Sequence, residues 1–158
     1  MNIIVQKFGG TSVSTEDRRK QVAIKVKEAI ENGFTPIVVV SAMGRKGQPY
    51  ATDTLLTLID DKFKETNRNS KDLLMCCGEI ISSVVVANAL YNEGIEAVPL
   101  TGGQAGIITD DNFCEAEYIS IDIDRLLSVV REGKVPVVTG FQGITKDGYF
   151  TTLGRGGS

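Results

Sequence analysis

Hydrophobic residues follow two alternating patterns along this chain. In one pattern, Val and Ile form short continuous runs, which are typical of strands covered on both faces of a sheet. In the other, apolar residues recur at helical spacing and give one buried face. The strand-like runs are residues 3–5, 35–41, 97–102 and 135–140, and the helical stretches are 15–32, 84–90 and 123–131. This alternation predicts an open α/β sheet whose strands run mostly parallel.

Cap and turn residues separate the predicted helices from the strands. Ser14, with Asp17 three residues later, has the pattern of a capping box and would begin the first helix. Gly33, Gly94 and Gly133 each follow a helical stretch and precede a strand, where glycine suits the left-handed C′ position. The same helix–glycine–strand unit therefore occurs three times.

Polar residues stand at the predicted carboxyl ends of the strands. Lys7, Ser41, Thr101 and Thr139 each follow an apolar run. In open α/β sheets, ligands bind beyond the carboxyl ends of the strands. We therefore expect these four residues to share one binding edge.

The stretch at residues 7–12 (KFGGTS) carries the features of a phosphate site. It joins a lysine, two adjacent glycines and two hydroxyls at a strand-to-helix corner. Glycines allow backbone N–H groups to approach an anion, and a helix start adds unpaired N–H donors. The alternative is an ordinary strand–turn–helix corner with a surface lysine.

Periodicity is weaker in the middle of the chain. Thr52 would cap a helix that reaches Phe63, and residues 67–70 indicate a polar connection. Gly78 lies in an apolar helical run, where glycine costs about 1 kcal/mol relative to alanine, so we expect a break or a close contact there. The adjacent Glu79 has apolar neighbours and needs a partner if it is buried. Alternatively, Glu79 caps a helix start and faces water.

The last residues combine a hairpin pattern with a glycine-rich end. Asp147 and Gly148 suit a two-residue type I′ turn between strands within residues 144–151. Residues 154–158 (GRGGS) follow, and Ser158 stands at an N-cap-like position, as if a helix were to begin. A flexible tail is the alternative.

Composition narrows the class of function. The 158 residues suit one domain, and the net charge of −3 gives no general attraction to nucleic acid or to an anionic membrane. We find no apolar run near the ~18 residues needed to span a bilayer, and no secretory signal. Three cysteines, at positions 76, 77 and 114, argue against a disulfide framework and favour a reducing cytoplasm.

The absence of histidine limits the chemistry further. It excludes Ser–His and Cys–His nucleophile pairs and, with the cysteine spacing, it argues against a zinc site. The remaining groups suit phosphoryl transfer, in which positioning and charge neutralisation carry most of the catalysis. Glu79 and Arg155 could recognise a zwitterion, because a carboxylate pairs with an ammonium and a guanidinium pairs with an α-carboxylate. A phosphate site beside an amino acid site indicates an amino acid kinase.

Six blocks of sequence, in order, resemble the aspartokinases, which are members of the amino acid kinase superfamily. The blocks are residues 7–13, 40–44, 78–79, 101–106, 140–143 and 151–158. The resemblance implies one domain over residues 1–158, built as a three-layer αβα sandwich with a mostly parallel central sheet. It also implies ATP-dependent phosphorylation of the β-carboxylate of L-aspartate to aspartyl phosphate, the first step toward lysine, threonine and methionine. Mg²⁺ would be bound mainly through the phosphates.

The resemblance also implies a role for each matching residue. Lys7 would neutralise charge on the transferring phosphoryl group, Glu79 would bind the ammonium of aspartate, and Arg155 would bind its α-carboxylate. The phosphate-binding positions would be Lys7, Phe8, Gly9, Gly10 and Ser41. The other aspartate-binding positions would be Thr52, Phe141, Gly156, Gly157 and Ser158. No residue is expected to ligate a metal.

Members of the family continue beyond the last block into an aspartate and a helix, then a nucleotide-base pocket and regulatory domains. We therefore expect a truncated, acceptor-binding portion that is inactive alone. Its uncovered strand edge and apolar surface should lead to self-association or to marginal stability. A non-catalytic amino-acid-binding module, or a kinase for another acceptor such as glutamate or a nucleotide, is the alternative. A Rossmann dinucleotide site is disfavoured, because the glycines at 9 and 10 lack a third spaced glycine.

Overall fold

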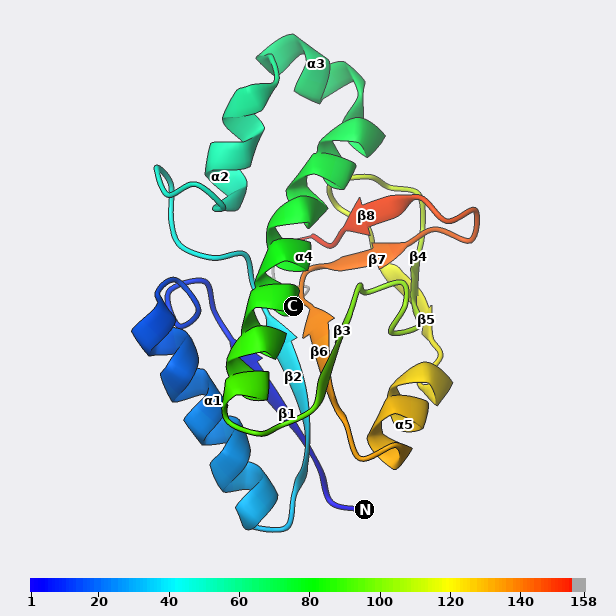
Figure 1. Ribbon diagram of the computed structural model, residues 1–158. Helices are drawn as coiled ribbons and strands as arrows, with labels where there is room; N and C mark the ends of the chain where they lie inside the picture. Colours follow the sequence, from blue (N-terminus) through cyan, green and yellow to red (C-terminus); the bar gives the residue numbers. More distant parts are fainter. Residues whose placement is uncertain (155–158) are drawn as a thin grey trace.

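The computed structural model describes residues 1–154 and folds them around two sheets (Figure 1). Sheet A is parallel, with strand order β1-β2-β6-β3. Its strands are β1 (Ile3–Phe8), β2 (Thr35–Val40), β3 (Ala97–Leu100) and β6 (Val135–Thr139). Sheet B has the order β5-β4-β7-β8 and mixes antiparallel and parallel pairs. Its strands are β4 (Ile107–Thr109), β5 (Tyr118–Ile121), β7 (Gln142–Ile144) and β8 (Phe150–Thr152).

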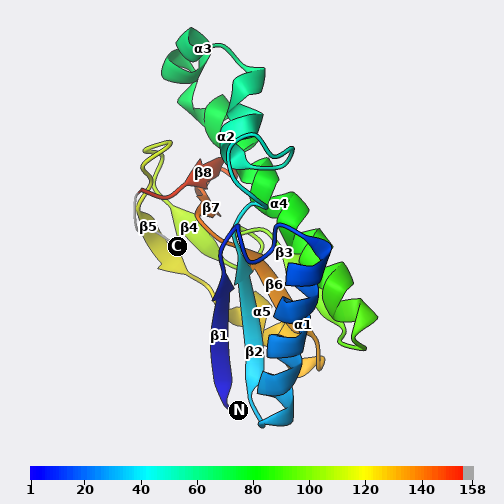
Figure 2. The same cartoon turned by 90° about the vertical axis from the view of Figure 1, so that its left-hand side faces the viewer.

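Helices cover both faces of sheet A (Figures 1 and 2). One face is covered by α1 (Glu16–Glu31) and α4 (Arg68–Asn92), and the other by α5 (Asp124–Arg131). An arm projects beyond the sheets. It consists of α2 (Thr52–Leu55), the 3-10 turn η1 (Leu56–Leu58), α3 (Asp61–Thr66) and the start of α4. The predicted αβα sandwich with a mostly parallel central sheet is confirmed.

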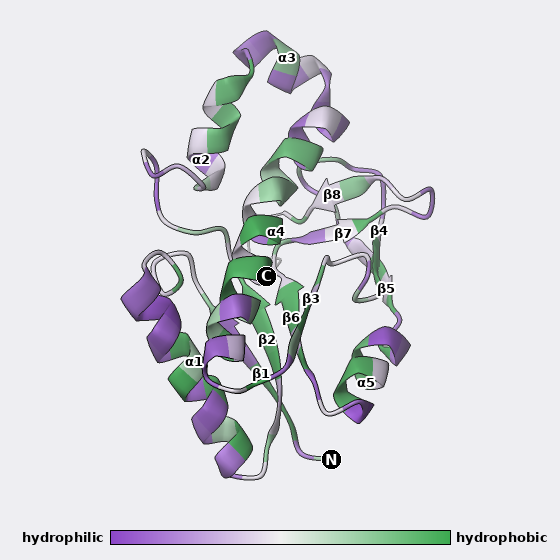
Figure 3. Cartoon of the chain, viewed as in Figure 1, coloured by the Kyte–Doolittle hydropathy of each residue, from purple (hydrophilic) through white to green (hydrophobic). Residues whose placement is uncertain are grey.

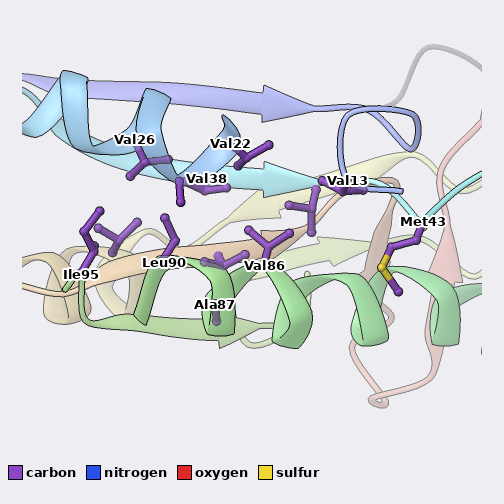
Figure 4. Packing of buried hydrophobic residues seen from close by; sticks show 13 residues of the cluster. Val13, Val22, Val26, Val38, Met43, Val86, Ala87, Leu90 and Ile95 are labelled. Carbon is purple, nitrogen blue, oxygen red and sulfur yellow. The ribbon is translucent and has the colours of Figure 1, made fainter. Parts of the chain in front are cut away.

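Two apolar clusters hold the layers together. Val26 of α1, Val38 of β2 and Leu90 of α4 belong to the first cluster, whose packing is shown in Figure 4. Ile37 of β2 and Val129 of α5 belong to the second. Successive residues of β2 therefore enter opposite clusters, which explains why this strand is continuously apolar. Figure 3 shows the same concentration of hydrophobic residues in the central strands and in α4.

Strand β1 forms an edge of sheet A within the described part of the chain. Its Ile3 and Val5 side chains are exposed, and Val5 retains 62% of its accessible surface. Val5 pairs in register with Ile37, which is buried beneath α5. An uncovered strand edge with apolar side chains favours association with another surface, and self-association of this chain stays a prediction.

Several predicted helix boundaries were wrong. Thr15 caps α1 in place of Ser14: its hydroxyl accepts a hydrogen bond from the Arg18 N–H at 3.3 Å, whereas the Ser14 hydroxyl donates to the Thr11 carbonyl. The expected polar connection at 67–70 lies within α4 except for its first residue. These residues are polar because the first turn of α4 belongs to the projecting arm, where side chains face solvent and not a hydrophobic core.

The single helix expected from residue 52 to Phe63 is interrupted. Thr52 is the first residue of α2, and Ala51 occupies the N-cap position without a side-chain cap. Extended backbone at Ile59 and Asp60 separates the 3-10 turn from α3. Asp60 occupies the N-cap position of α3, and its side chain makes no capping hydrogen bond to that helix.

The hairpin between β7 and β8 is confirmed, but its turn type is not I′. Ile144 pairs with Phe150, so five residues connect the two strands. Gly148 has a φ of 87°, whereas Asp147 is not in the left-handed region, and a type I′ turn requires positive φ at both central residues. The Thr145 carbonyl accepts from the Gly148 N–H at 2.9 Å and closes the wider turn.

Helix α4 differs from expectation in one further respect. Among the described residues it is the one helix that is long and apolar enough to cross a membrane, by length and composition alone, although no such run was expected. Glu79 and the adjacent Ser82 and Ser83 interrupt the apolar run, yet its mean hydropathy is 1.9. α4 packs against α1, β3, β6 and β8, and a core helix of a folded domain satisfies the same test.

Candidate active site

The carboxyl ends of the strands in sheet A are joined by short backbone hydrogen bonds. The Ser41 N–H donates to the Phe8 carbonyl at 3.1 Å, and the Gly140 N–H donates to the Val40 carbonyl at 2.8 Å. Lys7 pairs in register with Val39, one residue before these contacts. The structure therefore brings the 7–12 stretch, Ser41 and the start of the 140–143 block to one edge, as the strand pattern predicts.

The two glycines of the 7–12 stretch have different surroundings. A Cβ atom on Gly10 would lie 2.5 Å from the Ala42 carbonyl oxygen, and the Gly10 carbonyl accepts from the Gly44 N–H at 3.0 Å. Gly10 thus allows the first loop to lie directly against the loop after β2. Gly9 is exposed, and a Cβ atom there would meet nothing within 4 Å. The open backbone next to Lys7 is the part that an anion could approach.

We expect Gly10→Ala to lower the free energy of unfolding by about 2 kcal/mol or more, because the added methyl meets backbone that cannot move aside cheaply. Gly9→Ala is the matched control and should change stability by less than about 1 kcal/mol. Urea denaturation of both variants measures the difference. Equal stability of the two variants would contradict this distinction.

Glu79 lies in the middle of α4, next to the loop after β2. Its side chain is only 6% exposed, so the alternative of a water-facing cap is wrong. Burial raises the pKa of the Glu79 carboxyl to about 7, although a hydrogen bond from the Ala42 backbone N–H acts in the opposite direction. A buried carboxylate of this kind is suited to bind a cation that enters the site.

Gly78 explains how Glu79 comes so close to that loop. α4 continues unbroken through Gly78, and a Cβ atom there would lie 2.8 Å from the Ala42 Cβ and 3.3 Å from the Tyr50 carbonyl. The predicted close contact is confirmed and the predicted break is wrong. The close approach of Gly78 to Tyr50 also brings the segment that leads to Thr52 against α4, beside Glu79. Thr52 itself is half-buried.

Phe141 occupies the bend that leads from β6 to β7. Its φ of 64° is unusual for a residue other than glycine. The Phe141 carbonyl accepts from the Leu153 N–H at 3.0 Å, which brings the end of β8 beside the carboxyl end of β6. Four of the predicted aspartate-binding positions lie outside the described residues: Arg155, Gly156, Gly157 and Ser158.

Two buried polar residues, one in α4 and one in sheet B, were not predicted. Asp72 is fully buried in α4, and Gln142 of β7 donates from its Nε2 to the Cys76 carbonyl at 3.2 Å. The available signal was the spacing of Asp72, Cys76 and Glu79, which places them on one face of a helix. Within residues 1–154, no cluster of three or more Cys, Asp or Glu side chains could hold a metal ion.

The fold and this edge define a class: an α/β domain with a polar site beyond the carboxyl ends of a parallel sheet. The chain belongs to the amino acid kinase family, whose family model matches residues 2–158. The resemblance to aspartokinases is confirmed. Aspartokinase 1 of Bacillus subtilis (strain 168) is 51% identical over 158 residues, which cover 100% of this chain and 39% of that protein. The aspartokinase of Geobacillus stearothermophilus is 43% identical over the whole chain and 38% of its own length.

Solved structures show the same likeness. The aspartate kinase from Synechocystis superposes with a TM-score of 0.72 at 40% identity, covering 100% of this chain and 25% of that one. The aspartokinase III of E. coli, solved in complex with aspartate and ADP, has a TM-score of 0.77 at 22% identity, covering 99% of this chain and 44% of that one, and it supports the fold. The chain spans about two fifths of the length of the curated relatives it matches.

Proposed function

We propose that this chain forms, as a single domain, the acceptor-binding portion of an aspartate kinase. The observation that carries the proposal is Glu79, a buried carboxyl that contacts the loop after β2 at the edge where Lys7 and Ser41 also lie. A phosphate-compatible loop and a buried acid at one edge suit a kinase whose acceptor carries an ammonium group. The aspartokinase relatives support aspartate as that acceptor.

In this proposal the acceptor is held by groups of opposite charge. Glu79 binds the ammonium of aspartate, and Arg155 binds its α-carboxylate through a two-pronged pair of hydrogen bonds. Thr52 and Phe141 border the acceptor from α2 and from the bend after β6. Gly156, Gly157 and Ser158 complete the pocket. The β-carboxylate is then free to point toward the phosphate loop.

Phosphoryl transfer takes place at the carboxyl end of β1. An oxygen of the β-carboxylate forms a bond to the γ-phosphorus of ATP while the bond to the bridging oxygen breaks, which yields aspartyl phosphate and ADP. Lys7 stabilises the charge on the transferring group, and the exposed backbone around Phe8 and Gly9 accommodates its oxygens. Ser41 donates its backbone N–H to the Phe8 carbonyl, and in this proposal it contacts both substrates.

Mg²⁺ supplies charge neutralisation between the phosphates when it is bound. The proposal places the protein in the cytoplasm, where aspartate and ATP are its partners.

Calorimetric titration with L-aspartate and with succinate tests the acceptor assignment. Succinate keeps both carboxylates but lacks the ammonium, so it should bind at least tenfold more weakly if Glu79 recognises that group. The titrations are run at pH 8, where the Glu79 carboxyl is mainly ionised. Equal affinity for the two acids, or no aspartate binding, would contradict the proposal.

A further inference from the structure

The loop between β1 and α1 has backbone carbonyls that are held by hydrogen bonds. The Gly9 carbonyl accepts from the Ser12 N–H at 2.9 Å, and the Gly10 carbonyl accepts from the Gly44 N–H at 3.0 Å. A backbone loop binds an anion through its N–H groups, whereas a carbonyl oxygen turned toward the anion would repel it. Bonds that fix the carbonyls therefore also decide which side of the loop an anion can approach.

Two arginines in the first turn of α1 hold further carbonyls of the same loop. Arg18 donates from its Nη1 to the Thr11 carbonyl at 3.0 Å, and the Ser14 hydroxyl donates to the same oxygen at 2.9 Å. Arg19 donates from its Nη1 to the Val13 carbonyl at 2.8 Å. The loop thus has its carbonyls tied down partly by cations of the helix that follows it.

Arg19 differs from Arg18 because it also reaches the loop after β2. Its Nη1 lies 3.6 Å from the Met43 Sδ, and Met43 follows Ser41 by two positions. Arg19 is half-buried, and both Val13 and Met43 belong to the first apolar cluster (Figure 4). A guanidinium is a planar group with donors in a fixed fork, so this one group can set how the two loops lie against each other.

We infer that Arg19 is a positioning residue for phosphoryl transfer. It holds the carbonyl side of the first loop against the loop after β2, which leaves the exposed backbone at Gly9 open to the phosphoryl group beside Lys7. This inference rests on the proposed function. Arg19 contacts neither substrate in this account, so its loss should lower the rate of transfer and leave the affinity for aspartate unchanged.

The start of α1 offers matched controls. Arg18, Arg19 and Lys20 are consecutive, and each carries one positive charge. Without Arg18, the Thr11 carbonyl would still accept from the Ser14 hydroxyl. Lys20 is exposed and takes part in none of the contacts above. Replacing each of the three with Met removes the same charge and keeps an apolar stem, which separates the contacts of Arg19 from a general effect of charge.

The rate is measured in a chimera in which this chain replaces the matching 158 residues of Aspartokinase 1 of Bacillus subtilis. ATP and L-aspartate are saturating, and the temperature is one at which circular dichroism shows every variant to be folded. Arg19→Met should lower the rate about tenfold, Arg18→Met at most about threefold, and Lys20→Met less than about twofold. A contact that only stabilised the fold would leave the rate of the folded chimera unchanged.

Two further measurements sharpen the test. Calorimetry should show that Arg19→Met binds L-aspartate within about twofold of the affinity of the unmodified chain. Arg19→Lys keeps the charge, but its single ammonium on a flexible stem cannot replace the fork at both Val13 and Met43. Its rate should therefore fall about threefold, between those of Arg19→Met and the unmodified chimera.

The outcomes separate this inference from the proposed function. An unmodified chimera without turnover contradicts the proposed function, and with it this inference. When the unmodified chimera is active, a full rate in Arg19→Met, an equal fall in all three methionine variants, or a parallel loss of aspartate affinity overturns the role of Arg19 alone. If Arg19→Met does not fold, Arg19→Lys provides the second test, and a full rate in that variant overturns the inference.

Discussion

Replacing Glu79 with Gln should abolish measurable aspartate binding and, at pH 8, make the folded chain more stable. The glutamine keeps the size of the side chain and can still accept from the Ala42 N–H. It removes the charge that would pair with the ammonium of the acceptor, and loss of such a buried charged partner costs at least a hundredfold in affinity. Function and stability should therefore change in opposite directions.

The gain in stability follows from the burial of Glu79. Its pKa is raised from 4.5 to about 7 in the folded chain. Below pH 4.5 the Glu79 carboxyl is protonated in both the folded and the unfolded chain, and the folded chain has its full stability. This stability is lost as the pH rises through 7, because the unfolded chain then gains more from ionising the carboxyl than the folded chain does. At pH 8 the buried charge costs up to roughly 3 kcal/mol, which Glu79→Gln avoids.

Urea denaturation at pH 5.5 and pH 8 measures this effect. The stability advantage of Glu79→Gln should be larger at pH 8 than at pH 5.5 by about 2 kcal/mol. Glu31→Gln, at the exposed end of α1, is the control and should leave the free energy of unfolding close to that of the unmodified chain. Aspartate affinity of the wild type should rise with pH through 7. A loss of stability in Glu79→Gln at pH 8 would contradict the account.

Replacing Lys7 with Ala should lower the rate of phosphoryl transfer about a thousandfold. Lys7 is exposed at the end of β1, one residue before the Phe8–Ser41 contact. The aspartate affinity of the chain should stay within about twofold, because the proposed role of Lys7 concerns the phosphoryl group alone. Lys25→Ala, which removes an exposed ion pair with Glu28, is the control and should retain the full rate.

The rate is measurable in a chimera in which this chain replaces the matching 158 residues of Aspartokinase 1 of Bacillus subtilis. Its product, an acyl phosphate, is trapped with hydroxylamine and counted as the hydroxamate. A Lys7→Ala chimera as fast as the unmodified one would exclude Lys7 from the phosphoryl site.

The strands of sheet A and the three glycine-terminated helices could be predicted because their signals are local. Runs of Val and Ile mark buried parallel strands, and Gly33, Gly94 and Gly133 all have the positive φ that a helix C′ position requires. The polar edge followed from the same pattern, since parallel strands end on the same side. Lys7 and Ser41 were located in this way.

The remaining features depend on contacts between residues far apart in sequence. Nothing near Gly10 indicates that it, and not Gly9, meets Ala42. The burial of Glu79 depends on how α4 lies against the loop after β2, and the buried Asp72 carboxyl accepts a hydrogen bond from Thr152, eighty positions away. Periodicity describes one element at a time, so it could suggest that these residues matter but could not identify their partners.

Turnover by the unmodified chimera tests most directly whether this chain forms the acceptor site of an aspartate kinase. The chimera, supplied with ATP, Mg²⁺ and L-aspartate, should form aspartyl hydroxamate. Succinate should not replace aspartate, and Glu79→Gln should eliminate the product. A folded chimera that binds ATP but forms no hydroxamate from aspartate would contradict the account, and it would favour a non-catalytic binding module or a kinase for another acceptor.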